Sequence, residues 1–293
     1  MAWGMREIRS ILFVPGDRPD RMEKALAGPA DAIIVDLEDA VAPAARPEAR
    51  LLAAGFIAAA ARDKPIVVRV NPLDSGLIDD DLAAVLGARP DAIMLPKSLD
   101  GGSVAALAAK LDKAGADGVG ILPIVSETPA AIFGCGTYKG SSERLVGMTW
   151  GAEDLPAAIG ASASRFPDGS FTPVYDVVRT LALMGAHAAG VQAIDTVYPA
   201  FRDLDGLRAC AGRGRRDGFT GMMAIHPAQV EIINSVYSPG EEELDRARRI
   251  VALFAANPGA GALAMDGGMV DAPHLKAARR LLARAGERAD GDG

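Results

Sequence analysis

The chain has 293 residues, of which 49% are hydrophobic and 24% are charged, and its formal net charge is −7. No apolar run approaches the length of a membrane-spanning helix, so the composition indicates a soluble globular protein with a large core. Lysine and arginine are scattered along the chain, which argues against a nucleic acid or an anionic membrane as partner. We therefore expect a small-molecule partner.

The N-terminal segment and the cysteines both indicate a cytoplasmic protein. The segment MAWGMREIRS has no apolar core of the kind that a secretion signal contains. The two cysteines, Cys135 and Cys210, lie far apart and do not have the spacing of metal ligands. We expect both thiols to be reduced.

Short apolar runs rich in β-formers alternate with longer, alanine-rich stretches of helical pattern. This alternation predicts a (β/α)8 barrel over residues 1–238, a fold of typically about 250 residues, and leaves an open doubly wound sheet as the alternative. The eight runs span residues 8–15, 31–39, 65–72, 91–97, 118–127, 144–154, 191–199 and 219–227.

Nearly every run carries its charged or unusual residues at its C-terminal end. In (β/α)8 barrels the active site lies at that end of the strands, so we expect these side chains to meet there. They are Asp36, Glu38, Arg69, Asn71, Lys97, Glu127, Asp154, Asp195 and His226.

Several motifs in this order resemble those of one enzyme family. They include RSILFVPGDRPDRMEKAL, DLEDAVAP, VVRVNP, DAIMLPKS, GAEDLPAAIG, AIDTVYPAFRDLDGL, GFTGMMAIHPAQVEIINSVYSP and GGMVDAPHLKAARRLL. Together they are similar to the citrate lyase β-subunit family of CoA-ester lyases, which includes malyl-CoA and citramalyl-CoA lyases. The resemblance implies a Mg²⁺-dependent lyase that cleaves or forms a 3-hydroxyacyl-CoA thioester from an acyl-CoA and a 2-oxo acid.

The resemblance implies that Glu127 and Asp154 hold the Mg²⁺ ion. Two carboxylates completed by waters and substrate oxygens suit this ion, which seldom takes an all-protein cage. The residues alone allow a second interpretation, in which Glu127 and Asp154 merely cap the helices that follow them.

Arg69 is the expected catalytic and substrate-binding residue of the third strand. Its planar guanidinium matches a carboxylate, and in the family the corresponding arginine holds the 2-oxo acid. The alternative is that Arg69 only joins two strands by pairing with Asp36, Glu38 and Asp39. We expect these three acids to position Arg69 and metal-bound waters, because an unpaired charge there is costly.

The loop and helix after the first strand are basic and suit the phosphates of coenzyme A. Arg18 and Arg21 lie there, and the resemblance implies that Phe13 and Lys24 line the acyl-CoA path. Solvated surface is the alternative for these cations. His226 is expected to line the substrate site, with a purely structural role as the alternative.

Residues 239–293 are expected to form a C-terminal helical extension with a glycine-rich, mobile linker over residues 257–270. Asp271 precedes its last helix and on its own reads as a helix cap. By resemblance it is the catalytic acid/base, which a neighbouring subunit delivers, so we expect a homo-oligomer, a trimer or hexamer. His274 has no partner visible in the sequence.

Two other functions remain open. The chain could be an aldolase of free 4-hydroxy-2-oxo acids, although the first loop and Asp271 argue against this. It could also be a subunit of a citrate lyase complex that acts on a citryl-acyl-carrier-protein thioester. Which acyl group is bound does not follow from the sequence, because one methylene is worth only about 1–3 kcal/mol in such a pocket.

Overall fold

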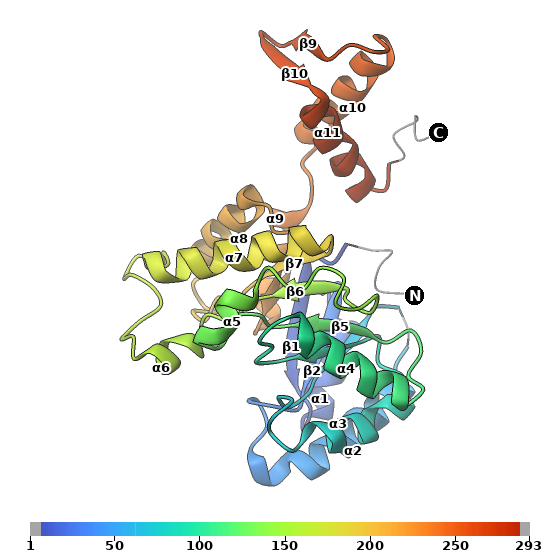
Figure 1. The fold of residues 1–293 in the computed structure, drawn as a ribbon, viewed down its shortest axis with the longest axis vertical. Coiled ribbons are helices and arrows are strands. Elements are labelled where there is room, and N and C mark those ends of the chain that lie inside the picture. Colours follow the sequence, from blue (N-terminus) through green and yellow to red (C-terminus); the bar gives the residue numbers. More distant parts are fainter. Residues whose placement is uncertain (1–6, 62, 288–293) are drawn as a thin grey trace. The chain divides into compact units, whose positions relative to one another are not determined.

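Figure 1 shows the computed structural model of the chain, which describes residues 7–61 and 63–287. The chain divides into two compact units, which are described separately. The first extends to Tyr237 and the second begins at Ser238.

The first unit is built on eight parallel strands. They are β1 (Ser10–Pro15), β2 (Ala32–Asp36), β3 (Ile66–Arg69), β4 (Ala92–Leu95), β5 (Gly120–Pro123), β6 (Gly147–Thr149), β7 (Gln192–Asp195) and β8 (Gly221–Ala224). Their order is β5-β4-β3-β2-β1-β8-β7-β6. Parallel bridges from Ile121 to Leu145 and from Ile124 to Thr149 join β5 to the β6 side. The sheet therefore closes into the predicted barrel, and the open-sheet alternative is wrong.

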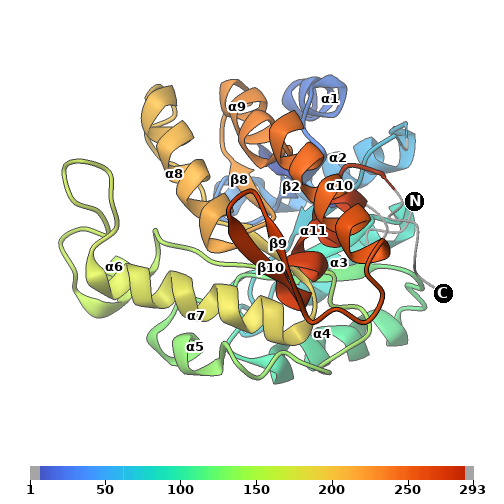
Figure 2. The ribbon, with the colours of Figure 1, turned by 90° about the horizontal axis from the view of Figure 1, so that it is seen from above.

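Helices surround the strands (Figure 1, Figure 2). They are α1 (Pro19–Ala27), α2 (Arg46–Ala59), α3 (Ile78–Val85), α4 (Gly101–Lys113), α5 (Pro129–Gly134), α6 (Leu155–Ile159), α7 (Pro173–Ala189), α8 (Leu204–Asp217) and α9 (Pro227–Tyr237), with the short 3-10 turns η2 (Pro43–Ala45) and η3 (Leu86–Ala88).

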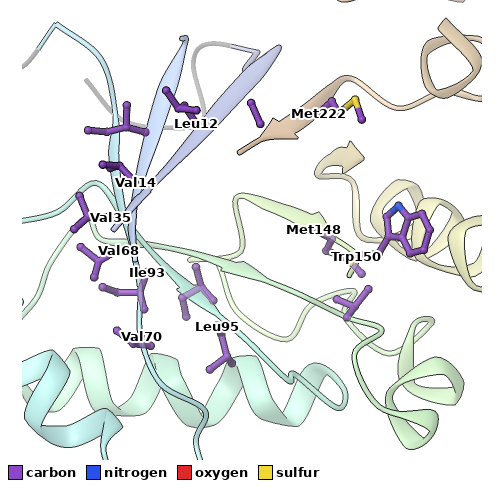
Figure 3. Close-up of a cluster of buried hydrophobic side chains, with 14 of the residues drawn as sticks. Leu12, Val14, Val35, Val68, Val70, Ile93, Leu95, Met148, Trp150 and Met222 are labelled. Carbon is purple, nitrogen blue, oxygen red and sulfur yellow. The ribbon is translucent and has the colours of Figure 1, made fainter. Parts of the chain in front are cut away.

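The strands separate two buried hydrophobic clusters. Ala32 and Ile34 belong to the inner cluster, whereas Ile33 and Val35 pack in the outer cluster between strands and helices. Figure 3 shows part of the outer cluster. Because side chains alternate along a strand, the continuously apolar sequence of β2 is what a strand buried on both sides requires. The same alternation directs Asp36, at the end of β2, to the inner side.

The second unit contains α10 (Glu241–Ala255), β9 (Ala262–Met265), β10 (Gly268–Asp271) and α11 (Ala272–Arg284). The expected linker is in fact an antiparallel hairpin, so that expectation was wrong. Asp266 and Gly267 form its two-residue turn and both have positive φ, 51° and 75°, which matches the turn that Asp-Gly favours. Among the described helices, none has both the length and the hydrophobicity to cross a membrane.

Candidate active site

Arg69 ends β3 directly beside Asp36, which ends β2. Its Nε and Nη2 donate to the two carboxylate oxygens of Asp36 at 2.7 and 2.6 Å, and its Nη1 lies 3.2 Å from Glu38 Oε2. Burial of Arg69 opposes its charge, but the bonds and charge of Asp36 outweigh burial and raise the guanidinium pKa. Arg69 therefore does pair with Asp36 and Glu38, as the alternative interpretation predicts. A substrate would have to bind to Arg69 while this pairing is present.

Phe13 of β1 lies beneath this arginine. The Arg69 Cζ atom is 4.9 Å from the centre of the Phe13 ring, a cation–π contact. Phe13 is partly buried and packs against the inner hydrophobic cluster. It therefore supports Arg69 from the barrel interior.

The acids after β2 have different environments. Asp36 accepts backbone hydrogen bonds from Glu38 and Ala40 at 3.0 and 2.9 Å. It therefore holds both the turn after β2 and the side chain of Arg69. Glu38 is 2% exposed, and burial raises the pKa of its carboxyl although Arg69 and a neighbouring lysine oppose the shift. Asp39 is exposed, and its negative charge helps to raise the pKa of Arg69. The three acids thus do not form one equivalent set.

Lys97 connects the two halves of the site, a role that the sequence reasoning missed. Its Nζ donates to Glu38 Oε1 at 2.7 Å, and its backbone N–H donates to Glu127 Oε2 at 2.5 Å. The backbone of Lys97 has φ = 51°, in the left-handed region that non-glycine residues seldom adopt. The position of the lysine at a strand end was visible in the sequence, but this backbone conformation was not.

Glu127 follows β5 and is 3% exposed. Burial raises the pKa of its carboxyl to about 8; the hydrogen bond from Lys97 opposes this, and the charges of Asp154 and Glu38 add to it. Thr128 is the N-cap of α5 and accepts a hydrogen bond from the Ala131 N–H at 3.4 Å. The interpretation of Glu127 as the cap of that helix is therefore wrong.

Asp154 occupies the N-cap position of α6, but its side chain makes no capping hydrogen bond. The capping interpretation fails here too. Ser126 Oγ, beside Glu127, donates to the Gly151 carbonyl at 3.1 Å and accepts from the Gly151 N–H at 3.0 Å. The polypeptide segments that carry the two acids are thereby tied together.

The pair Glu127 and Asp154 fits a Mg²⁺ ion. Neither carboxylate is used to cap a helix, and the charge of one disfavours ionisation of the other. Within residues 7–61 and 63–287, no group of three or more histidine, cysteine or acidic side chains is arranged to hold a metal. The protein can thus supply two carboxylates, and Mg²⁺ commonly takes its remaining ligands from water and substrate.

The cations of α1 are at the surface. Arg18 pairs with Asp20 at 3.1 Å, and both side chains are exposed. Arg21 and Lys24 are also exposed, with Lys24 in the last turn of the helix. These cations are therefore accessible to solvent and to a phosphate-bearing ligand.

His226 follows β8 and is exposed. Its Nδ1 accepts a hydrogen bond from the Ala228 N–H at 3.2 Å, and its ring stacks on Phe201 with centroids 4.9 Å apart. These contacts fix the orientation of the imidazole, so a structural role is present whether or not the ring also borders a substrate.

Asp271 lies in the second unit and is the N-cap of α11, accepting from the His274 N–H at 3.4 Å. Its Oδ1 also lies 2.5 Å from His274 Nδ1, so His274, whose partner was not visible in the sequence, pairs with Asp271. The hydrogen bond with His274 lowers the pKa of the Asp271 carboxyl. Asp271 therefore caps α11, as its position in the sequence indicates.

Comparison with known proteins agrees with this geometry. Residues 9–227 match the HpcH/HpaI aldolase/citrate lyase family. A citrate lyase subunit beta-like protein of Mycobacterium tuberculosis is 37% identical over 281 residues, which cover 94% of this chain and 95% of that protein. A (3S)-malyl-CoA thioesterase of Cereibacter sphaeroides is 38% identical, with 97% of each chain covered.

The solved structures that match include M. tuberculosis CitE in complex with magnesium, acetoacetate and coenzyme A. That structure has a TM-score of 0.82 and 34% identity, and the match covers 96% of this chain and 99% of that one. A citrate lyase beta subunit of the same organism, complexed with oxaloacetate and magnesium, has a TM-score of 0.71 and 34% identity, covering 80% and 100%. The chain belongs to the HpcH/HpaI aldolase/citrate lyase family, which confirms the predicted resemblance and places it among the lyases.

Proposed function

We propose that the protein is a Mg²⁺-dependent lyase that reversibly splits a 3-hydroxyacyl-CoA thioester into an acyl-CoA and a 2-oxo acid. The observation that carries the proposal is the buried Glu127, whose pKa is raised to about 8 beside a second carboxylate. Such a pair gains most from a divalent cation. The relatives support the class of substrate, since one is named a malyl-CoA thioesterase and another was solved with magnesium, acetoacetate and coenzyme A.

Glu127 and Asp154 would hold the ion. When bound, Mg²⁺ would supply Lewis-acid polarisation of the 2-oxo group. The Lys97 N–H holds one oxygen of Glu127, and the Ser126 contact with Gly151 keeps the adjacent loops in register. The chain itself therefore positions both carboxylates.

Arg69 would bind the carboxylate of the 2-oxo acid and stabilise the negative charge that develops on its oxygen. Asp36 fixes the guanidinium through two hydrogen bonds, and guanidinium N–H groups that do not bond to Asp36 remain for a substrate. Because the Arg69 guanidinium is already oriented before the substrate binds, less entropy is lost when the substrate is positioned.

Asp271, from a neighbouring subunit of a homo-oligomer, would move the proton of the acyl-CoA methyl group. The hydrogen bond with His274 lowers the pKa of this carboxyl, so the group is present as the carboxylate, the form that can accept a proton. Phe13, Lys24 and His226 would line the acyl-CoA path. A trimer or hexamer is the assembly that we propose for this exchange.

Incubating the purified protein and Mg²⁺ with malyl-CoA, citramalyl-CoA and citryl-CoA tests the proposal. We expect at least one thioester to yield a 2-oxo acid, detected as its hydrazone, and we expect EDTA to abolish the yield. Release of free CoA, measured with a thiol reagent, would reveal an additional hydrolysis step. No cleavage of any thioester would refute the proposed function.

Two alternatives give different results in the same assay. An aldolase of free 4-hydroxy-2-oxo acids would cleave such an acid and leave all three thioesters intact. A subunit of a citrate lyase complex would act only when the citryl group is carried by an acyl-carrier protein. The second alternative is favoured by the similarity to the citrate lyase subunit beta of Escherichia coli, which is 35% identical over 289 residues.

Subunit mixing tests the role of Asp271. Asp271→Asn retains a good helix cap, so the fold should persist, but turnover should be lost. Mixing this variant with inactive Glu127→Gln should restore part of the activity, through sites that combine one intact metal pair with one intact Asp271. Each variant mixed with itself is the control. Full activity in Asp271→Asn, or in a monomer, would contradict the proposed exchange.

A further inference from the structure

Asp195 ends β7, but its side chain does not point into the barrel. Ala193 belongs to the outer hydrophobic cluster and Ile194 to the inner one, so the alternation along the strand directs Asp195 outward, towards the helices. The expectation that this acid joins the other strand-end residues of the site was therefore wrong. Asp195 is 1% exposed, and a carboxylate is seldom buried so deeply unless other groups pair with it. Its partners therefore indicate what it does.

Two side chains hold the Asp195 carboxylate. Arg179 of α7 donates from Nε and Nη2 to Oδ2 at 3.3 and 3.0 Å and supplies a compensating positive charge. The indole Nε1 of Trp150 donates to Oδ1 at 2.7 Å, and this bond crosses to the end of the neighbouring strand β6. Arg179 thus accounts for the burial of the charge, whereas the bond to Trp150 fixes a side chain on another strand.

Trp150 lies at the base of the segment that carries Asp154. It directly follows β6, is fully buried and belongs to the outer hydrophobic cluster (Figure 3). Its ring also contacts Phe171, with ring centroids 5.0 Å apart. The chain between these two aromatic residues contains Asp154 and α6, so it leaves the indole and returns to it. The position of Trp150 therefore sets where both ends of this segment lie.

The residue after Trp150 packs against the other metal acid. A Cβ placed on Gly151 would lie 3.0 Å from Glu127 Cγ, so the backbone there is close to the Glu127 side chain. Ser126 exchanges two hydrogen bonds with the same glycine. A shift of Trp150 would therefore reach both carboxylates, Glu127 through Gly151 and Asp154 through the segment that follows.

We propose that Asp195 is a positioning residue for the metal site and acts through Trp150, an inference that rests on the proposed function. Asp195 faces the helices, so it would touch neither the ion nor the substrate. It fixes the indole, and the indole fixes the backbone that carries Asp154 and packs on Glu127. Mg²⁺ demands near-ideal octahedral geometry, and loss of a group that only orients its ligands typically lowers metal affinity by about 10–100-fold. The alternative is that Asp195 only balances Arg179 in the core, which predicts a loss of stability alone.

Trp150→Phe tests the proposal, because it removes the indole N–H and keeps a ring that can contact Phe171. Tyr198→Phe is the matched control, since the Tyr198 hydroxyl is also in a buried residue and also donates to an aspartate, Asp203, at 2.7 Å. We expect calorimetric titration to show about tenfold weaker Mg²⁺ binding in Trp150→Phe and wild-type affinity in Tyr198→Phe. Equal affinities in the two variants would overturn the proposal.

Asp195→Asn separates positioning from stability. The amide keeps an oxygen for the Trp150 N–H but loses the charge that balances Arg179. We therefore expect Asp195→Asn to have a lower melting temperature than Trp150→Phe and yet to bind Mg²⁺ with an affinity close to that of the wild type. An Mg²⁺ affinity that falls in step with the melting temperature across these variants would leave Asp195 a structural role only.

A glycine on α8 provides a third test if these variants do not fold. A Cβ placed on Gly214 would lie 2.6 Å from Asp195 Oδ2, so Gly214→Ala displaces the carboxylate from a helix that carries neither metal acid. Gly212→Ala is the control on the same helix, because its Cβ would meet only the flexible Arg216 side chain, at 3.8 Å. We expect weaker Mg²⁺ binding in Gly214→Ala alone, and equal affinities would again overturn the proposal.

The wild type distinguishes failure of this inference from failure of the proposed function. Absence of Mg²⁺ binding by the wild type would count against the proposed function. Wild-type binding that is unchanged in Trp150→Phe and in Gly214→Ala would overturn the positioning role of Asp195 and leave the metal site in place.

Discussion

Replacing Glu127 with glutamine should stabilise the metal-free protein while it destroys the metal site. The carboxyl is 3% exposed and its pKa is raised to about 8, from 4.5 in an unfolded chain. A raised pKa means that the folded protein binds the proton more tightly than the unfolded chain does. The associated stability is therefore complete below about pH 4.5 and is lost as the pH rises towards 8.

The size of the effect follows from the pKa difference. At 1.36 kcal/mol per pKa unit, the wild type loses about 3 kcal/mol by pH 7 and about 5 kcal/mol above pH 8. Glutamine carries no charge and can still accept the hydrogen bond from the Lys97 N–H. The free energy of unfolding of Glu127→Gln should therefore be higher than that of the wild type by about 3 kcal/mol at pH 7 and by about 5 kcal/mol above pH 8. At pH 4.5 the two proteins should differ little.

Urea unfolding in EDTA at pH 4.5, 7 and 9, followed by circular dichroism, measures this difference. Substitution of the exposed Glu23 by glutamine is the control for the amide change itself. Added Mg²⁺ should stabilise the wild type and leave Glu127→Gln unaffected, because only the former binds the ion. A variant that is less stable than the wild type at pH 9, or a pH-independent difference, would refute the reasoning.

Three further outcomes are expected. Arg69→Lys should lower kcat/KM by about 100-fold or more and should also lower the melting temperature, because lysine lacks the planar fork that makes both hydrogen bonds to Asp36; near-normal turnover would leave Arg69 a strand-pairing role only. Mg²⁺ binding should tighten about tenfold from pH 6 to pH 7, measured by calorimetry, since Glu127 must release its proton; constant affinity would contradict its raised pKa. Gly151→Ala should weaken Mg²⁺ binding, because its Cβ would lie 3.0 Å from Glu127 Cγ, whereas Gly136→Ala meets nothing and should not.

The barrel could be predicted because its strands leave a strong pattern in the sequence. Strands buried on both sides require continuous apolar runs, and each of the eight strands lies within a predicted run. The hairpin of the second unit was missed although Asp266 and Gly267 are a favourable turn pair. The glycines around them favoured a linker, and β9 and β10 are only four residues long and contain a single β-branched residue, Val270.

The site was predictable as a set of strand ends but not as a set of contacts. Asp36, Arg69 and Glu127 follow apolar runs, so their common location was visible in the sequence. The role of Lys97 depends on a backbone with φ = 51° that turns its N–H towards Glu127, and lysine gives no sign of that conformation. Likewise, Asp154 resembles a helix cap in sequence, and only the geometry shows that its side chain makes no cap.

The charges of the site explain why two of its acids differ from the others. Asp36 is paired with Arg69, and Glu38 is paired with Lys97, so each of these carboxylates has its own cation. Glu127 accepts a hydrogen bond from the backbone N–H of Lys97, and the negative charge of Asp154 raises the pKa of its carboxyl. A divalent ion would carry the positive charge that Glu127 and Asp154 do not receive from an ion pair with a lysine or arginine side chain within the described residues. Removing a cation partner should therefore disturb the pairs, whereas removing Glu127 or Asp154 should leave both pairs in place and abolish metal binding.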